Sequence, residues 1–433
     1  MIKKTRTILF FICFCLFLLI APSVILYSQG YRFDFEKKKT TQTGGLFLKA
    51  EPKQVEIYIN NELAKKTDFF FGSALVENLL PKKYKIEVKK EGYLSWEKNL
   101  EIREKEVTEV KNIVLFLENL NFNILTPHQK NGDGEVENFW FSPDEKKIIL
   151  VEKEKTGWAL KLYNLDKNVK SHLINEKDIY AKGAELINLE FSSDSKEIYL
   201  DIAMKEQEKH FALSLDKSPP QLMERKVTPI PDYNPTTLPP SAGPYIIASQ
   251  KINNDFYYLD NFGYVFKNEM KLNEEPFPVQ SETEYSLEIF QNVVFLSEGK
   301  TLYLFSPDSK SFEKFFEGIN DLKISPDNKK IVFFSNSEIW ILFLKDADIK
   351  KAGEKLFINR LSEKIDAVFW LNPDYLIFNS GDNLKIVEID DRDRIQTWDI
   401  ASFPNPEIYF NGSDRKLYIL SEGNLYSSGE LVR

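Results

Sequence analysis

The sequence contains few side chains of the kinds that usually perform catalysis or hold metals. Its three histidines, His128, His172 and His210, are neither spaced as H-x-x-x-H nor close to a cysteine. Zinc and haem sites commonly depend on such spacings, so each histidine is expected in a solvated loop or at the edge of a sheet. The chain also lacks the G-x-S-x-G nucleophile motif and the glycine motifs that bind phosphates or dinucleotides. We therefore expect no catalytic residue, no cofactor and no metal site, and we expect that the protein is not an enzyme.

Two acidic stretches are the places where calcium could be sought. Residues 131–137 (NGDGEVE) include Asp133 but do not place oxygen ligands at consistent alternate positions. Residues 390–394 (DDRDR) include Arg392 and Arg394, which would repel a cation. Solvated turns are the favoured interpretation of both stretches.

A short sequence recurs along the chain and indicates a repeated structural unit. Ser-Pro-Asp occurs at 142–144, 306–308 and 325–327, and Ser192-Ser193-Asp194 differs only in its middle residue. Proline fixes φ near −65° at the first central position of a turn, and serine and aspartate side chains can bond to nearby backbone N–H groups. The motif is thus typical of a tight turn between two strands. The copy at 306–308 follows the strand TLYLF, so it is expected in an outer loop.

The residues around these turns repeat as well. Residues 137–167 and 187–217 align with an offset of 50, and both run strand, turn, lysine-rich tip, strand, loop and strand. Related units are found at 321–346, 367–390 and 406–428, with two further blade-like stretches at 255–275 and 286–318.

Repeats of this length with about four short strands each are typical of β-propellers. The units resemble the TolB-like and WD40-like propeller family, whose turns usually read SPDG, although Glu145, Ser195 and Asn328 replace the glycine here. Counting these units gives about seven blades between residues 121 and 433, with six or eight as the alternatives. We expect the tryptophans of the repeats to pack between blades, namely Trp140, Trp158, Trp340 and Trp370.

The propeller resemblance also defines one enzymatic alternative. Lactonase-like propellers hold a metal at the channel mouth with scattered acids and asparagines. Residues of these types on the first strands of the repeats are Asn138, Glu190, Asp321 and Asp366. One sequence does not show whether these side chains converge.

A proline-rich stretch interrupts the repeats at residues 218–244. Eight of the chain's twenty prolines lie there, which favours extended backbone and opposes regular strand pairing. It is interpreted as an insertion between blades, with a docking segment for a peptide partner as the alternative.

The N-terminal residues 1–31 are predicted to form an uncleaved signal anchor. Thr7 to Tyr31 carries no charge, and 25 residues at about 1.5 Å each can cross a hydrocarbon core of roughly 30 Å. The preceding cations favour a cytoplasmic N-terminus and an extracytoplasmic body. Both cysteines, Cys13 and Cys15, lie in this segment, so the remaining chain can form no disulfide.

After a linker at 32–45, residues 46–118 show period-two alternation typical of strands. The order Glu51-Pro52, VEIYINN, LLPKKYKIEV and EGY resembles the PEGA domain, a small bacterial β-sandwich of envelope proteins. The resemblance implies a non-catalytic domain. The whole chain is therefore predicted to be all-β after its helix, with a PEGA-like sandwich followed by a propeller.

Charge limits the partners. Beyond Lys3, Lys4 and Arg6, 54 basic and 66 acidic residues leave the chain at −12, which argues against nucleic acid or an anionic lipid surface as the main partner. We expect a membrane-anchored scaffold that binds a protein or an envelope polysaccharide. A structural envelope component and a lactonase-like hydrolase are the alternatives.

Overall fold

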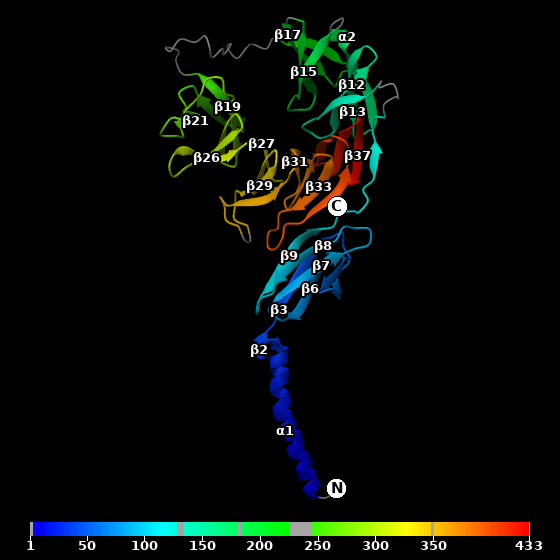
Figure 1. Cartoon of the computed structure of the whole chain (residues 1–433), viewed down its shortest axis with the longest axis vertical. Helices are drawn as coiled ribbons and strands as arrows, with labels where there is room; N and C mark the ends of the chain where they lie inside the picture. The colour runs from blue at the N-terminus through cyan, green and yellow to red at the C-terminus, as the bar shows by residue number, and fades with distance from the viewer. Residues whose placement is uncertain are drawn as a thin grey trace. The chain divides into compact units, whose positions relative to one another are not determined.

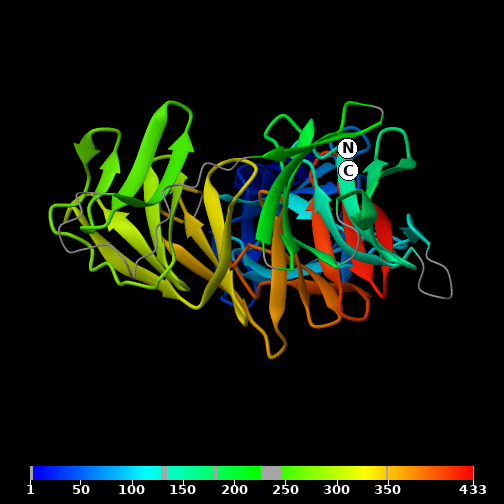
Figure 2. The same cartoon turned by 90° about the horizontal axis from the view of Figure 1, so that it is seen from above.

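The computed structural model describes residues 3–127, 134–179, 183–205, 207–217, 219–225, 245–347 and 350–432. His128, Asp133 and most of the proline-rich stretch lie outside these residues. The chain divides into two compact units (Figures 1 and 2). Unit 1 comprises Met1–Leu120, Val387–Ile400 and Glu430–Arg433, and unit 2 comprises Asn121–Ile386 and Ala401–Gly429.

Unit 1 begins with the helix α1, Lys3–Ser28 (Figure 1). Its portion Ile8–Ser28 has a mean hydropathy of 2.9 and is long and apolar enough to cross a membrane, a test that a signal sequence would also pass. The segment predicted as a linker contains a hairpin of β1 (Tyr31–Asp34) and β2 (Lys39–Gln42). Asp34 closes this hairpin because its carboxylate accepts the N–H groups of Glu36 and Lys37.

The rest of unit 1 contains two sheets that bury a shared core. One sheet has the order β6-β3-β9 and the other β5-β4-β7-β8. Their bounds are β3 Gly44–Glu51, β4 Glu56–Ile59, β5 Glu62–Lys66, β6 Ser73–Leu79, β7 Lys83–Lys89, β8 Trp96–Glu101 and β9 Val107–Val114. Alternate residues such as Leu46, Leu48 and Ile57 are fully buried in this core. Asn60 and Asn61 have positive φ in the β4–β5 turn, as their sequence position predicts.

The described strands between residues 121 and 430 form seven four-stranded sheets, numbered here in chain order, of which sheet 6 includes strand residues 387–388 and 397–400 of unit 1. Apart from α1 and the four-residue α2 (Glu176–Ile179), the described regular structure is β-strand. Sheet 1 contains β11 Val136–Phe141, β12 Lys147–Glu154, β13 Gly157–Asn164 and β14 Val169–Asn175. Sheet 2 contains β15 Ala184–Phe191, β16 Glu197–Met204, β17 Gln207–Ser214 and β18 Gln221–Arg225. Sheet 3 contains β19 Ile246–Ile252, β20 Asp255–Asp260, β21 Val265–Lys267 and β22 Met270–Lys271. Sheet 4 contains β23 Tyr285–Phe290, β24 Val293–Glu298, β25 Thr301–Ser306 and β26 Ser311–Glu317. Sheet 5 contains β27 Ile319–Ile324, β28 Lys330–Ser335, β29 Glu338–Phe343 and β30 Lys355–Arg360.

Sheet 6 contains β31 Ile365–Asn372, β32 Tyr375–Ser380, β33 Asn383–Glu388 and β34 Thr397–Ser402. Sheet 7 joins the two ends of unit 2, because β10 (Phe122–Ile124) pairs with β37 (Asn424–Glu430), followed by β36 (Lys416–Ser421) and β35 (Glu407–Asn411). Strand β18 of sheet 2 lies inside the proline-rich stretch 218–244, for which the sequence predicts no regular strand pairing. β18 forms there because residues 221–225 contain no proline and can pair with β17.

The second strand of sheet 1 is apolar on both faces. In β12, Ile148 and Leu150 pack with sheet 7, whereas Ile149 and Val151 pack with sheet 2. Continuous apolar runs of this kind are expected where a sheet is covered on both sides. Sheet 1 therefore depends on two different neighbours for the burial of its side chains.

The Ser-Pro-Asp motifs form the predicted turns between the first and second strands. Ser325 Oγ donates to Asp327 Oδ1 at 2.6 Å and accepts the N–H groups of Lys329 and Lys330 at 3.2 and 2.9 Å. Ser142 and Ser192 make the corresponding bonds to Asp144 and Asp194. The copy at 306–308 connects β25 with β26, the third and fourth strands, as predicted.

In the three turns between first and second strands, the residue after the aspartate has a left-handed conformation, which glycine adopts without strain. Glu145, Ser195 and Asn328 have φ values of 56°, 58° and 55°. The carbonyl oxygen of each accepts a side-chain N–H from a neighbouring sheet. The donors are Asn411 Nδ2, Lys147 Nζ and Gln291 Nε2, respectively.

The predicted tryptophan packing is confirmed. Trp158 Nε1 donates to the carbonyl of Ala184 in sheet 2, and Trp370 Nε1 donates to that of Lys323 in sheet 5. Trp140 packs in the core shared by sheets 1 and 2, and Trp340 in the core shared by sheets 4 and 5.

We expect Ser325→Ala to lower the free energy of unfolding by about 1–2 kcal/mol, because it leaves two turn N–H groups without their buried acceptor. The matched control is Ser306→Ala, in the connection between the third and fourth strands of sheet 4. This variant should change the free energy of unfolding by less than about 0.5 kcal/mol. Thermal unfolding of both variants checks this. Equal losses of unfolding free energy in the two variants would contradict the stabilising role assigned to the Ser325 hydroxyl.

Candidate functional site

The four residues proposed from the sequence for a channel-mouth metal do not form a common site. Asn138, Glu190, Asp321 and Asp366 lie on β11, β15, β27 and β31, the first strands of four different sheets. The one group of His, Cys, Asp and Glu side chains close enough to hold a metal, within the part of the chain that the structure describes, includes none of them.

Local partners occupy these side chains instead. Asn138 Oδ1 accepts the N–H of Phe139 at 2.7 Å. Asp321 accepts the N–H of Leu322 at 2.8 Å and lies 3.4 Å from the ammonium of Lys323. Asp366 forms an ion pair of 2.6 Å with Lys364, and Glu190 accepts a long hydrogen bond from Asn188.

The two described histidines differ in their surroundings. His172 is exposed on the edge strand β14, as predicted, with Lys161 Nζ at 3.2 Å. His210 does not lie at a sheet edge. It is half-buried on β17, the third strand of sheet 2, and its Nδ1 lies 2.7 Å from Asp201 Oδ1.

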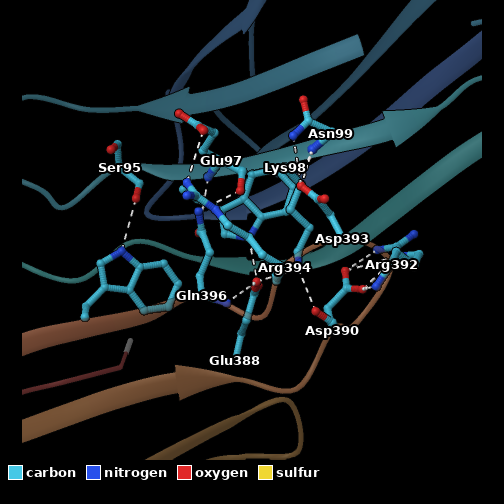
Figure 3. Close-up of polar contacts among 12 residues, drawn as sticks. Ser95, Glu97, Lys98, Asn99, Glu388, Asp390, Arg392, Asp393, Arg394 and Gln396 are labelled. Atoms are coloured by element: carbon cyan, nitrogen blue, oxygen red, sulfur yellow. Dashed lines mark hydrogen bonds and ion pairs between the residues drawn. The ribbon is translucent and has the colours of Figure 1, made fainter. Parts of the chain in front are cut away.

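Residues 390–394, predicted as a solvated turn, belong to a buried polar network within unit 1 (Figure 3). Its centre is Lys98, which is fully buried, and Glu388, which is 3% exposed. Lys98 Nζ contacts Glu388 Oε1 at 2.6 Å and donates to the carbonyls of Asp390 and Arg394 at 2.6 and 3.0 Å. All three ammonium protons therefore have partners. We call this group the Lys98 network.

The second oxygen of Glu388 is also occupied, because it accepts Trp96 Nε1 at 2.9 Å. Oε1 additionally accepts the N–H of Gln396 at 3.1 Å. Burial raises the pKa of Glu388, and the charge of Lys98 opposes that increase. Since both members of the pair are fully bonded, the Lys98 network is suited to holding the structure together and offers no open position for a substrate.

Further contacts fix the same segment to β8. The amide of Gln396 exchanges two hydrogen bonds with the backbone of Glu97, at 3.2 and 2.6 Å. Asp393 Oδ2 accepts the backbone N–H and side-chain Nδ2 of Asn99 at 2.8 and 3.1 Å (Figure 3). The sequence did not reveal this network, because its partners are nearly 300 positions apart.

In unit 2, four side chains on edge strands of neighbouring sheets form a continuous row. Lys323 Nζ lies 3.8 Å from the centre of the Phe369 ring. Phe369 lies 5.4 Å from Tyr409, and Tyr409 stacks on Phe141 with ring centres 4.0 Å apart and planes at 9°. We call Lys323, Phe369, Tyr409 and Phe141 the aromatic row; all four are half-buried.

Burial shifts the pKa values of two side chains in the aromatic row, Tyr409 and Lys323. Burial raises the pKa of Tyr409 to about 12, and the carboxylate of Glu145 acts in the same direction. Desolvation lowers the pKa of Lys323, although nearby Asp321 opposes it. The row offers ring faces and hydrogen-bonding groups, but no nucleophile paired with a base. Such a surface can bind sugar rings or apolar side chains.

Sequence reasoning missed the aromatic row for an identifiable reason. Phe141 lies one position before its turn residue Ser142, whereas Lys323 lies two positions before Ser325 and Phe369 three before Asn372. The offsets differ, so aligning the repeats does not mark these residues as equivalent.

Unit 1 also presents an exposed apolar turn. Phe69, Phe70 and Phe71, between β5 and β6, are 64%, 75% and 73% exposed. Asp68 organises the turn by accepting the N–H groups of Phe71, Ser73 and Phe70. These bonds, that of Phe71 foremost, lower the pKa of Asp68 to about 2. Adjacent exposed aromatics of this kind are unusual on protein surfaces without a binding role.

Comparisons with known proteins give structural similarity alone. The sequence matches no family profile and no curated protein. The structure is similar to that of the RRP9 WD40 repeats, with a TM-score of 0.40, 11% identity, and coverage of 72% of this chain and 98% of that one. It is also similar to the Myceliophteria thermophila Cps50 (Swd1) β-propeller domain, with a TM-score of 0.39, 11% identity, and coverage of 72% and 99%.

Lys98→Met tests the Lys98 network. It leaves the carboxylate of Glu388 buried without its counter-ion, so we expect the opening free energy of β8 and residues 387–400 to fall by roughly 3–5 kcal/mol. Amide hydrogen exchange of peptides from both segments measures this. The double variant Lys98→Met/Glu388→Gln should recover part of the loss, because it removes the buried charge.

The matched control is Lys66→Met, which removes a lysine from strand β5 of the same sheet. Lys66 is exposed and pairs with Glu56 at 2.7 Å, so its removal should cost less than about 1 kcal/mol. Similar losses in Lys98→Met and Lys66→Met would contradict the assigned importance of the buried pair.

Proposed function

We propose that this chain is a membrane-anchored, extracytoplasmic binding or scaffold protein without catalytic activity. In this proposal α1 is an uncleaved anchor, unit 1 carries a PEGA-like sandwich, and the seven sheets of unit 2 are the blades of a β-propeller. The propeller holds a protein or an envelope polysaccharide at the aromatic row.

The aromatic row is the observation that carries the proposal. Three half-buried rings and a lysine lie in continuous contact across edge strands of four sheets. Stacking on ring faces contributes about 0.5–1.5 kcal/mol per aromatic pair beyond the area buried, and a cation over a ring adds to it. A partner that covers the row with apolar groups or sugar rings gains instead the burial of the row's remaining exposed apolar surface, without any bond being made or broken.

The anchor has its own support. Ile8–Ser28 is apolar and exposed along its length, and Lys3, Lys4 and Arg6 precede it. Positive residues favour the cytoplasmic side of a membrane span. This arrangement would place unit 2 and the part of unit 1 that follows α1 outside the cytoplasm, where an envelope partner is accessible.

Site-specific photo-crosslinking in intact membranes tests the proposal. A photoreactive amino acid replaces Phe369 in the full chain, and we expect one discrete adduct that disappears when Tyr409→Ala is added. The adduct's mass and its sensitivity to protease or glycosidase distinguish a protein from a polysaccharide partner.

The control position is Phe357 on the fourth strand β30, which is 40% exposed and lies outside the aromatic row. Adducts of equal yield at both positions, or none at Phe369, would contradict binding at the row. Recovery of the full chain in the soluble fraction after alkaline washing would contradict the anchor.

A further inference from the structure

We propose that Asp201, Glu208 and His210 in sheet 2 form a binding site for a divalent transition-metal ion, with Zn²⁺ as the best-matched ion. The site lies apart from the aromatic row and does not depend on the proposed function. The sequence predicts no metal site, because its histidines have none of the usual spacings.

Strand register brings the three side chains together. His210 on β17 is paired directly with Asp201 on β16, so both side chains project from the same face of the sheet. Glu208 is two residues from His210 on the same strand and shares that face. His210 Nδ1 lies 2.7 Å from Asp201 Oδ1, and one ligand atom from each of the three residues lies within 4.8 Å of the others.

A neighbouring strand orients the aspartate. Asn188 on β15 is the register partner of Asp201, and its Nδ2 donates to Asp201 Oδ2 at 3.2 Å. This bond leaves Oδ1 directed toward His210. Hydrogen bonds to the second atom of a ligating group are a common feature of metal sites, because they fix its orientation.

Local charge favours a cation at this position. Asn188 also donates to Glu190 Oε1 at 3.4 Å, so a third carboxylate lies on the same face. The opposing cation is Arg225 on β18, the register partner of His210. Its guanidinium stacks over the Tyr199 ring, 4.1 Å from the centre. Lys209 lies on the other face and pairs with Glu224 at 3.1 Å.

The donor set distinguishes between metals. One imidazole nitrogen and two carboxylate oxygens suit Zn²⁺, whose ligands lie about 2.0–2.2 Å away in a tetrahedron with water in the fourth position. Ca²⁺ instead takes 6–8 oxygen ligands, more than these side chains offer. All three side chains lie at least partly accessible to solvent, so an ion can enter and the ligands can adjust.

Titration of Zn²⁺ into the full chain in detergent micelles, followed by calorimetry, tests the site. We expect the wild type to bind one equivalent of Zn²⁺. The affinity for Zn²⁺ should fall at least tenfold in His210→Ala and in Asp201→Asn. Zn²⁺ should also raise the Tm of the wild type and not of His210→Ala, since an ion that binds only the folded state stabilises it.

His172→Ala is the matched control, because His172 lies on the neighbouring sheet beside a lysine and without an acidic partner in contact. It should leave Zn²⁺ affinity unchanged. The metal-free Tm of each variant establishes that it is folded. Equal Zn²⁺ affinity of wild type and His210→Ala, equal losses in His210→Ala and His172→Ala, or a preference for Ca²⁺ over Zn²⁺ would overturn the proposal.

Discussion

The structure of unit 2 depends on one constraint: a sheet that is apolar on both faces cannot bury itself. β12 directs Ile148 and Leu150 toward sheet 7 and Ile149 and Val151 toward sheet 2. Burying one such side chain contributes about 1.5–3 kcal/mol relative to leaving it exposed. Removing either neighbour would therefore cost sheet 1 several such contributions, so we expect sheets 2, 1 and 7 to be stable only together.

The turns between first and second strands make hydrogen bonds to adjacent sheets. In the three Ser-x-Asp turns between first and second strands, the left-handed residue after the aspartate directs its carbonyl to a donor on the neighbouring sheet. A non-glycine residue is less favourable in this conformation, but Glu145 compensates through its carboxylate, which accepts the N–H and hydroxyl of Ser413. The contact from Glu145 thereby links sheets 1 and 7, where Tyr409 stacks on Phe141 in the aromatic row.

Local patterns predicted the architecture well. Alternation predicted the strands near Val55 and Tyr84, and Ser325-Pro326-Asp327 predicted its turn with the correct side-chain bonds. The sites were harder to predict because they depend on pairing between distant residues. Lys98 meets Glu388 across 290 positions, and His210 meets Asp201 through strand register. Nothing in the spacing of either pair distinguishes it from other charged residues.

Cysteine labelling tests the mutual dependence of the sheets most directly. Both natural cysteines lie in α1 and can be replaced by alanine. A single cysteine is then placed at Leu200, Leu150 or Ile419, buried in sheets 2, 1 and 7. If the sheets open together, the labelling rates in urea give opening free energies that agree within about 1 kcal/mol. Opening free energies that differ by several kcal/mol between sheets would contradict the account.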